Sequence, residues 1–431
     1  MTRLQSAWRL AAAGAAATLI LASCGSDDDD SGGDDTAGGG EESPSESGTG
    51  STAQGDGTLV VGSLLPSTGD LAFLGPPEFA GVDLAIDDIN QAGGVLGQQV
   101  TGVDADSGDG TPNIAPGSTD KLLDQGADVI VGAASSSVSL SVIDKITGAG
   151  VVHFSPANTS TEFDTYDDHD LYFRTAPSDV LQGAVMGNLV VDDGAQNIAI
   201  MARQDSYGEA LAENVAKTIE EQGATVSTKT LYNADATQFT AEVNEVASSN
   251  PDAIVLIAFN ETTKIVPRLI ASGVGPQDIP VYLVDGNCAD YSADFDPGTL
   301  AGSKCTYPGA ELTNDFKQRL LDTDPKLKDF TYGPESYDAT IMSALAATAA
   351  GSDAGEAIGS ELINISRDGT VCTEYSECVG LLEDGQDIDY DGVSGPCDLN
   401  DTGSPSKATI GIFQYENNNT YKNIEYVTGV I

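Results

Sequence analysis

Short apolar runs alternate with longer amphipathic segments along the chain from residue 58 onward. Runs such as 129–131 and 253–258 contain only apolar side chains, which is typical of strands buried on both faces of a sheet. Segments such as 207–222 repeat apolar residues at helical spacing. The predicted strands are 59–62, 100–103, 129–131, 151–154, 197–201, 225–231, 253–258, 281–284, 409–415 and 422–427. The predicted helices are 79–89, 121–125 (the end of a helix), 139–147, 180–191, 207–222, 239–248, 262–271 and 333–350, with a loop at 66–77.

The order of these elements predicts the fold class. Strands that alternate with helices form parallel sheets covered by helices on both faces, so we expect an α/β protein. The alternation restarts after Pro177, and 431 residues exceed what one hydrophobic core usually serves. The sequence therefore predicts two domains.

The N-terminus has the features of an export signal rather than of a folded segment. Arg3 and Arg9 precede an apolar run at 10–20 that is too short to span a membrane comfortably. The Leu-Ala-Ser-Cys that ends at Cys24 resembles a bacterial lipobox, which implies a lipoprotein signal peptide at 1–23 and lipidation of Cys24. An ordinary export signal with an incidental cysteine is the alternative. A lipidated residue is expected to anchor the protein without a spanning helix.

Residues 24–57 are predicted to form a linker between this anchor and the folded part. After the cysteine the segment consists mainly of Gly, Ser, Asp and Glu, includes four consecutive aspartates at 27–30, and contains no Lys or Arg. Such a segment buries too little apolar surface to offset the entropy of ordering, and its charges repel one another. We expect a disordered acidic tether.

The net charge of the chain limits the classes of partner that it is expected to bind. The 67 acidic and 18 basic residues give a formal net charge of -49. A chain of this charge repels phosphates, so no nucleic-acid partner is expected. Solvation of an extracellular surface explains the charge without a specific cationic partner.

The cysteines after Cys24 are expected to lie in an oxidising compartment, where disulfides persist. Spacing favours two local pairs, although sequence alone does not fix the connectivity. The favoured pairs are Cys288 with Cys305 and Cys372 with Cys378, which leaves Cys397 unpaired.

The chain contains none of the catalytic motifs G-x-S-x-G, G-K-[ST], H-E-x-x-H or G-x-G-x-x-G. The two histidines, His153 in a predicted strand and His169 in an acidic loop, offer little for a catalytic triad or a zinc site. We expect no enzyme, no cofactor and no metal. Calcium is the open alternative, because an EF-hand-like spacing occurs near the C-terminus without clear flanking helices. The residues with that spacing are Asp387, Asp389, Asp391, Gly392 and Asp398.

Several motifs, in this order along the chain, resemble the type I periplasmic binding proteins of the Leu/Ile/Val-binding class. Each motif is weak alone, and the series together is specific. The motifs are Leu-Leu-Pro-Ser-Thr-Gly at 64–69, Ala-Gly at 80–81 with Ala-Ile-Asp-Asp-Ile-Asn at 85–90 and Gly-Gly at 93–94, Val-Gly-Ala-Ala-Ser-Ser-Ser at 131–137, Ser-Pro-Ala-Asn-Thr at 155–159, Ser-Tyr-Gly at 206–208 and Asp-Tyr-Asp-Gly-Val-Ser-Gly-Pro at 389–396.

The resemblance implies a fold of two Rossmann-like lobes joined by a three-crossing hinge. The first lobe is expected at 58–177 and 309–405, and the second at 178–308 and 406–431. The ligand is expected in the cleft between them, at the carboxyl ends of the strands.

The resemblance also implies which residues bind the two charges of an amino acid. Ser136 and Thr159 are expected to bind the ligand carboxylate, in keeping with the anion affinity of a helix start. Asp285 and the carbonyl of Ala157 are expected to accept the ammonium. From the residues alone, a plain helix cap at 135–137 and a turn-forming Asp285 stay open.

The resemblance defines the pocket for the side chain of the ligand less closely. Tyr207 is expected to close onto the ligand from the second lobe, although a surface tyrosine at a helix start stays open. Leu74, or Phe73 beside it, matches the pocket wall. Phe259 or Asn260 stands where Leu/Ile/Val binders carry a tyrosine. This departure leaves room for another amino acid, an amide, a urea-like ligand or an aromatic acid.

The resemblance therefore implies an extracellular, lipid-anchored, monomeric substrate-binding protein of an ABC importer. It is expected to capture a branched-chain amino acid or a relative and to present it to an ABC permease complex by hinge closure. A ligand-sensing protein that serves a separate signalling partner is the alternative.

Overall fold

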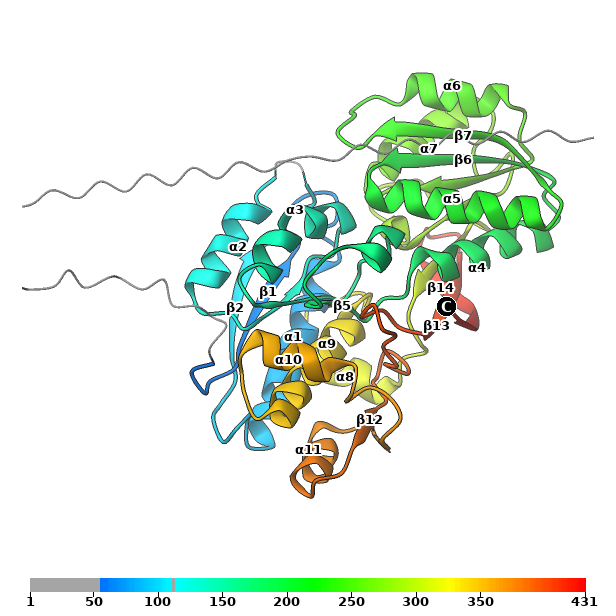
Figure 1. Ribbon diagram of the computed structural model, residues 1–431. Helices are drawn as coiled ribbons and strands as arrows, with labels where there is room; N and C mark the ends of the chain where they lie inside the picture. The colour runs from blue at the N-terminus through cyan, green and yellow to red at the C-terminus, as the bar shows by residue number, and fades with distance from the viewer. Residues whose placement is uncertain (1–54, 111–112) are drawn as a thin grey trace, which may run out of the picture. The chain divides into compact units, whose positions relative to one another are not determined.

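A computed structural model describes residues 55–110 and 113–431 of the chain (Figure 1). The predicted signal peptide, Cys24 and all but the last residues of the predicted acidic linker lie outside the described residues. Within the described residues, no helix is both long and apolar enough to cross a membrane.

The first sheet is parallel throughout and has the strand order β2-β1-β3-β4-β5. Its core strands are apolar because both faces are covered. One face packs against α1 and α9, and the other packs against α2 and α3. The strands are β1 (Val60–Leu65), β2 (Thr101–Asp106), β3 (Val129–Gly132), β4 (Val152–Ser155) and β5 (Tyr172–Arg174). The helices are α1 (Gly75–Gln91), α2 (Ala115–Asp124), α3 (Ser136–Thr147), α9 (Gly333–Ala350) and α10 (Gly355–Leu362). We call this part the first lobe.

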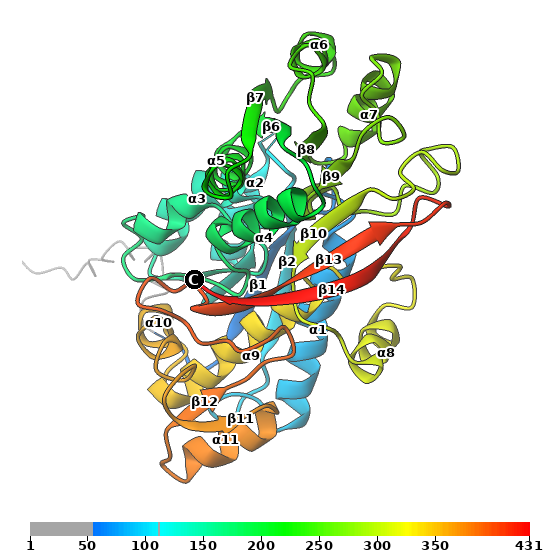
Figure 2. The ribbon, with the colours of Figure 1, turned by 90° about the vertical axis from the view of Figure 1, so that its right-hand side faces the viewer.

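The second sheet has seven strands in the order β14-β13-β10-β9-β8-β6-β7. Strands β6 to β10 are parallel, whereas β13 and β14 add an antiparallel ribbon at one edge (Figure 2). Helices α4 and α5 cover one face and α6 and α7 the other. The strands are β6 (Asn197–Gln204), β7 (Thr225–Asn233), β8 (Ala253–Ile257), β9 (Val281–Leu283), β10 (Lys304–Pro308), β13 (Lys407–Tyr415) and β14 (Tyr421–Val430). The helices are α4 (Asp179–Asp192), α5 (Ser206–Glu221), α6 (Thr240–Ser248) and α7 (Thr262–Ala271). We call this part the second lobe.

The chain passes between the two sheets three times, after β5, after β10 and before β13. The fold is thus the α/β fold of two Rossmann-like lobes that the sequence predicts. The structure also contains short elements that the hydrophobic pattern did not reveal. These are the 3₁₀ turns η1 (Thr161–Thr165) and η2 (Asp285–Asn287), helices α8 (Asn314–Thr323), α10 and α11 (Tyr375–Glu383), and strands β5, β10, β11 (Thr370–Cys372) and β12 (Ile388–Tyr390).

Two predicted helix starts are wrong. Helix α1 begins at Gly75, inside the predicted loop, because Pro76 and Pro77 occupy the first turn, where the missing N–H has no helical partner to lose. For α2 the sequence predicts only a helix end at 121–125, which the end at Asp124 confirms; the helix begins at Ala115. Helix α3 begins at Ser136 rather than at residue 139, since the serines form its first turn.

Two disulfides join Cys288 to Cys305 and Cys372 to Cys378, the same pairs that the spacing favours. Cys397 is the free cysteine among the described residues, and it is buried.

Candidate functional site

Two loops that follow strands of the first lobe are joined to each other by buried side chains. The Ser155 hydroxyl donates to the Ala133 carbonyl at 2.8 Å, and the Asn158 amide donates to the same carbonyl at 3.0 Å. The loop after β3, which leads to Ser136, is thereby fixed against the loop after β4, which carries Thr159. Since parallel strands end at one edge of a sheet, both candidate carboxylate ligands lie at the same edge.

Ser136 is the first residue of α3, and the preceding Ser135 does not cap the helix with its side chain. The first N–H groups of a helix have no intrahelical acceptor and carry the positive end of the helix dipole. The Ser136 hydroxyl accepts a long hydrogen bond of 3.4 Å from the Ser160 amide. This arrangement can bind a carboxylate.

Three residues of the second lobe meet where its strands end. Tyr207 lies in the first turn of α5 after β6, Phe259 follows β8, and Asp285 follows β9. The Tyr207 hydroxyl donates to Asp285 Oδ1 at 2.6 Å, and its ring stacks on Phe259 with centroids 5.6 Å apart. All three side chains are buried, so the carboxylate and the aromatic rings form one surface.

Asp285 accepts hydrogen bonds from both lobes. Gln182 Nε2 and the Tyr207 hydroxyl donate to Oδ1 at 2.8 and 2.6 Å, and the Tyr332 hydroxyl donates to Oδ2 at 2.9 Å. Tyr332 immediately precedes α9 and so belongs to the first lobe. Burial raises the pKa of Asp285, while these three donors oppose the rise.

Asp179, the first residue of α4, is a second buried carboxyl beside this site. Its amide donates to the Thr159 carbonyl at 2.7 Å, but neither carboxyl oxygen has a well-formed hydrogen bond. Burial, and then the charge of Asp285, raises the pKa of Asp179 well above its usual value, while the nearby Thr159 hydroxyl opposes the rise. The Thr159 hydroxyl and Gln182 Oε1 are also buried without a well-formed hydrogen bond.

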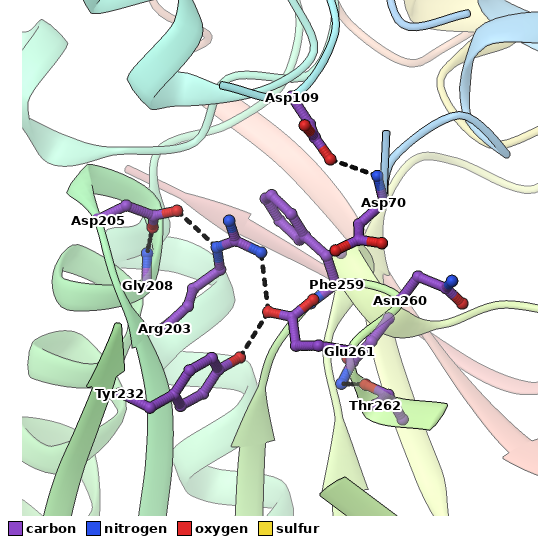
Figure 3. Close-up of polar contacts among 12 residues, drawn as sticks. Asp70, Asp109, Arg203, Asp205, Gly208, Tyr232, Phe259, Asn260, Glu261 and Thr262 are labelled. Atoms are coloured by element: carbon purple, nitrogen blue, oxygen red, sulfur yellow. Dashed lines mark hydrogen bonds and ion pairs between the residues drawn. The ribbon is translucent and has the colours of Figure 1, made fainter. Parts of the chain in front are cut away.

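Phe259 is held in place by a buried cation (Figure 3). The Arg203 guanidinium lies 3.4 Å from the centre of the Phe259 ring and pairs with Asp205 at 2.5 Å and Glu261 at 2.9 Å. The Tyr232 hydroxyl donates to Glu261 at 2.7 Å. The neighbouring Asn260 is exposed, whereas Phe259 is buried against Tyr207.

Apolar side chains from both lobes pack together around these polar groups. Leu74 and Ala157 of the first lobe belong to the same buried cluster as Tyr207 and Phe259 of the second, with Phe73 packed at its border. Helix α5 also contacts α3 and η1. The two lobes are therefore in contact across the site, as in a closed binding protein.

The acidic loop near the C-terminus does not form an EF hand. Asp389 lies within strand β12, and Gly392 packs against the Asp338 carboxyl. The ligand atoms of Asp389, Asp391 and Asp398 lie within 4.8 Å of one another, whereas Asp387 is not part of this group. Burial, and then the charges of Asp398 and Asp391, raises the pKa of Asp389.

The sequence did not single out Asp179, Gln182, Arg203 or Tyr332. An acidic residue at a helix start ordinarily indicates an interaction with the helix dipole, so Asp179 gave no separate signal. Tyr332 precedes a Gly-Pro helix start in a region without a recognised motif. Tertiary contacts within the second lobe bring Gln182 to Asp285 and Arg203 to Glu261, and contacts between the lobes bring Tyr332 to Asp285 and Asp179 to Thr159.

Comparisons with known proteins agree with this architecture. A family model described as periplasmic binding protein matches residues 58–376. The chain is 31% identical over 283 residues to a leucine-, isoleucine-, valine-, threonine- and alanine-binding protein of Pseudomonas aeruginosa, covering 64% of this chain and 73% of that protein. It is 25% identical over 359 residues to the chemotactic signal transduction system substrate-binding protein BasB of Halobacterium salinarum, covering 79% of this chain and 83% of that protein.

Solved structures show the same fold. The branched-chain amino acid transporter substrate-binding protein LivJ of Streptococcus pneumoniae, in complex with isoleucine, superposes with a TM-score of 0.68 at 22% identity and covers 87% of this chain and all of that chain. A benzoate-bound solute-binding protein of R. palustris gives a TM-score of 0.70 at 17% identity, covering 87% of this chain and 98% of that one. The chain belongs to the type I periplasmic binding proteins of the Leu/Ile/Val-binding class, a family of substrate-binding proteins rather than enzymes.

Proposed function

We propose that this protein captures a small α-amino acid between its lobes and presents it to an ABC permease. The observation that carries the proposal is the set of buried acceptors without well-formed hydrogen bonds at the interlobe site. Both carboxyl oxygens of Asp179 and Oε1 of Gln182 are in this state, and Gln182 is itself bonded to Asp285. Such atoms are costly to leave unpaired. The ammonium group of a ligand offers three hydrogen-bond donors, and the two nearby carboxyls favour its positive charge.

The opposite charge of the ligand fits the first lobe. The uncapped start of α3 at Ser136 and the Thr159 hydroxyl, which lacks a well-formed hydrogen bond, supply donors for a carboxylate. The Ala157 carbonyl lies in the same loop and supplies another ammonium acceptor. The site therefore favours a zwitterion, and the two carboxyls of Asp179 and Asp285 disfavour an acid that lacks an amine.

The ligand side chain is proposed to face Leu74, Phe259 and Tyr207. These side chains present an apolar wall with two stacked rings, which suits a branched-chain or similar apolar side chain. Because ligand groups contact both lobes at once, binding is expected to favour the closed arrangement, and the closed surface is what a permease reads. The proposed moving units are 58–177 with 309–405 and 178–308 with 406–431.

The experiment is a calorimetric titration with L-leucine and with two truncated analogues. 4-Methylpentanoate lacks the ammonium, and 3-methylbutylamine lacks the carboxylate. We expect leucine to bind and each analogue to bind at least about 30-fold more weakly, because each leaves buried charges unpaired. Equal affinity for leucine and 4-methylpentanoate contradicts the ammonium site.

Variants locate the site. Asp285→Asn and Asp179→Asn are expected to weaken leucine binding at least about 30-fold each. Asp192→Asn, at the exposed far end of α4, is the matched control and is expected to bind as the parent does. Unchanged affinity in the Asp285 variant removes this residue from the site.

The proposal includes attachment of the protein to the outer face of the cell membrane through a lipid on Cys24, with the folded part monomeric. The family places such proteins outside the cytoplasm, and the lipobox-like sequence supports the lipid. Cells that express the full chain are expected to hold it in the detergent-rich phase on phase separation, and Cys24→Ser is expected to release it. Retention of the variant in that phase contradicts lipid anchoring.

A sensing role is the second candidate, favoured by the relationship to the chemotactic protein BasB, which covers 79% of this chain. Both roles use the same ligand-closed form. Stimulation of a reconstituted permease ATPase by the leucine-loaded protein supports import. Absence of stimulation, together with ligand-dependent binding to a receptor, supports sensing.

A further inference from the structure

A cavity lies beside the crossing of the chain from β10 to α8, and we call it the hinge cavity. Its volume is about 370 Å³, which is in the range of small-molecule sites. Its walls come from both lobes, with Lys317 of α8 and Tyr332 on one side and Phe413 of β13 and Tyr421 of β14 on the other.

One wall of the hinge cavity is a rigid aromatic surface. The rings of Tyr307 and Phe413 stack with centroids 4.2 Å apart and an interplanar angle of 10°. Tyr421 meets Phe413 edge to face at 5.5 Å. Rings fixed in this way can bury the flat face of an aromatic ligand without a further loss of side-chain entropy.

The charge of the cavity differs from that of the rest of the protein. The chain has eleven lysines and a net charge of -49, yet three of the lysines line this one cavity. Lys422 pairs with Glu416 at 2.8 Å, whereas Lys317 and Lys328 form no ion pair with any described carboxylate. Among the lining acids Asp290, Asp329 and Glu335, burial raises the pKa of Glu335 to about 8, so this group is mostly neutral at pH 7, and burial also raises the pKa of Asp329. Lys317 and Lys328 therefore offer an anion two cations that no ion pair with a described carboxylate already neutralises.

The hinge cavity shares a residue with the interlobe site. Tyr332 lines the cavity, and its hydroxyl donates to Asp285. An occupant of the cavity touches both lobes in their closed arrangement, so its binding favours closure. It also rests against the tyrosine that holds the proposed ammonium acceptor.

We propose that the hinge cavity is a second ligand site, which binds a small aromatic carboxylate through its stacked rings and through Lys317 and Lys328, and which stabilises the closed lobes. The site is distinct from the interlobe site, and its existence does not rest on the ligand proposed there. Its coupling to that ligand does rest on the proposed function.

The test uses benzoate as the probe and benzamide as its neutral counterpart, titrated into the full chain and followed by calorimetry. We expect benzoate to bind and benzamide to bind at least about ten-fold more weakly, since the amide lacks the charge that the lysines attract. Lys317→Gln/Lys328→Gln is expected to weaken benzoate about ten-fold. Lys326→Gln, an exposed lysine in the same loop that does not line the cavity, is the matched control and is expected to change nothing.

A filling variant tests the location without a change of charge. Ala310 lines the cavity, and Ala310→Trp is expected to abolish benzoate binding while leucine binding persists. The proposal is overturned if benzoate fails to bind at ~10 mM, a weak limit even for a ligand of this size. It is also overturned if the affinity for benzoate is the same in the double-lysine and tryptophan variants as in the parent and falls in Ser136→Ala, because benzoate then occupies the interlobe site.

The coupling between benzoate binding and leucine binding is measured by the same calorimetric titrations. Saturating benzoate is expected to tighten leucine binding several-fold, and leucine to tighten benzoate binding by the same factor. If the protein binds no leucine, the proposed function fails, but lysine-dependent benzoate binding still supports the hinge site. If leucine binds and benzoate does not, the hinge site alone fails.

Discussion

Tyr332 of the first lobe donates a hydrogen bond of 2.9 Å to Asp285 of the second. Both side chains are almost completely buried, at 2% and 4% exposure. The contact connects the position of the proposed ammonium acceptor to the closure of the lobes, because it exists only when the two parts of the chain meet. Ligand affinity therefore includes the energy of this contact.

Tyr332→Phe removes this hydrogen bond and keeps the ring. A hydrogen bond to a charged group contributes about 1.5–3 kcal/mol, so leucine affinity is expected to fall about ten- to a hundred-fold. Calorimetry measures the change. Tyr375→Phe, which removes a buried hydroxyl that donates to the Gly94 carbonyl at 3.1 Å, is the control and is expected to bind leucine normally. An unaltered affinity in Tyr332→Phe shows that the contact does not contribute to binding.

Leucine binding is expected to release a proton at pH values below the raised pKa of Asp179. Burial raises the pKa of Asp179 well above its usual value, so the carboxyl keeps a proton at pH values where an exposed aspartate has lost it. The ligand ammonium favours the ionised form and lowers that pKa, so the proton leaves and affinity rises with pH. Calorimetry in buffers of different ionisation enthalpy measures the release. Asp179→Asn is expected to abolish the dependence on buffer, and a parent protein without any such dependence contradicts the argument.

Arg203→Met is expected to destabilise the second lobe. The guanidinium pairs with Asp205 and Glu261, and its loss leaves the buried Glu261 and the largely buried Asp205 without their cation. Breaking a buried ion pair from one side costs about 3–5 kcal/mol of unfolding free energy. Urea denaturation measures this loss. Arg268→Met removes a half-buried side chain that donates to Thr240 and Gln238 at the surface and forms no ion pair with a described carboxylate, so it is expected to cost no more than ~1 kcal/mol. If the two variants lose the same unfolding free energy, the prediction that the buried ion pairs of Arg203 matter more than the surface contacts of Arg268 is wrong.

The stability of the protein is expected to fall as pH rises from about 4.5 toward about 8. Burial raises the pKa of Glu335 from 4.5 to about 8, and the buried Glu78 nearby has both oxygens without hydrogen bonds and a raised pKa. When the pKa of a group is higher in the folded state than in the unfolded state, the group stabilises the folded state most at pH values below its pKa in the unfolded state. This stabilisation is lost as the pH rises through the pKa of the group in the folded state.

Glu335→Gln is expected to flatten this pH dependence of the unfolding free energy, measured by urea denaturation at several pH values. Glu356→Gln changes an exposed glutamate in the first turn of α10 and serves as the control. A pH profile that is the same in Glu335→Gln as in the parent excludes Glu335 as its source.

The sequence by itself determined the fold class and most of the elements. Strands such as β3 and β8 are buried on both faces, so their apolar runs stand out from the polar loops, and α9 begins and ends where its pattern predicts. The missed elements are short or polar. Strand β5 has three residues, and α8 is a mostly exposed helix with few apolar side chains, so neither carries enough periodicity to be recognised.

Tertiary structure decided which polar groups face one another. The motifs placed Ser136, Thr159, Tyr207 and Asp285 at strand ends, and the structure brings Tyr207 and Asp285 into contact. The role of Tyr332 depends on a hydrogen bond to a residue 47 positions away, and that of Asp179 depends on burial without a well-formed hydrogen bond to its carboxyl. Neither leaves a mark in local sequence. The spacing of apolar residues in one segment reflects how that segment packs against its core. The chemistry of a cleft depends instead on contacts between separate segments of the chain.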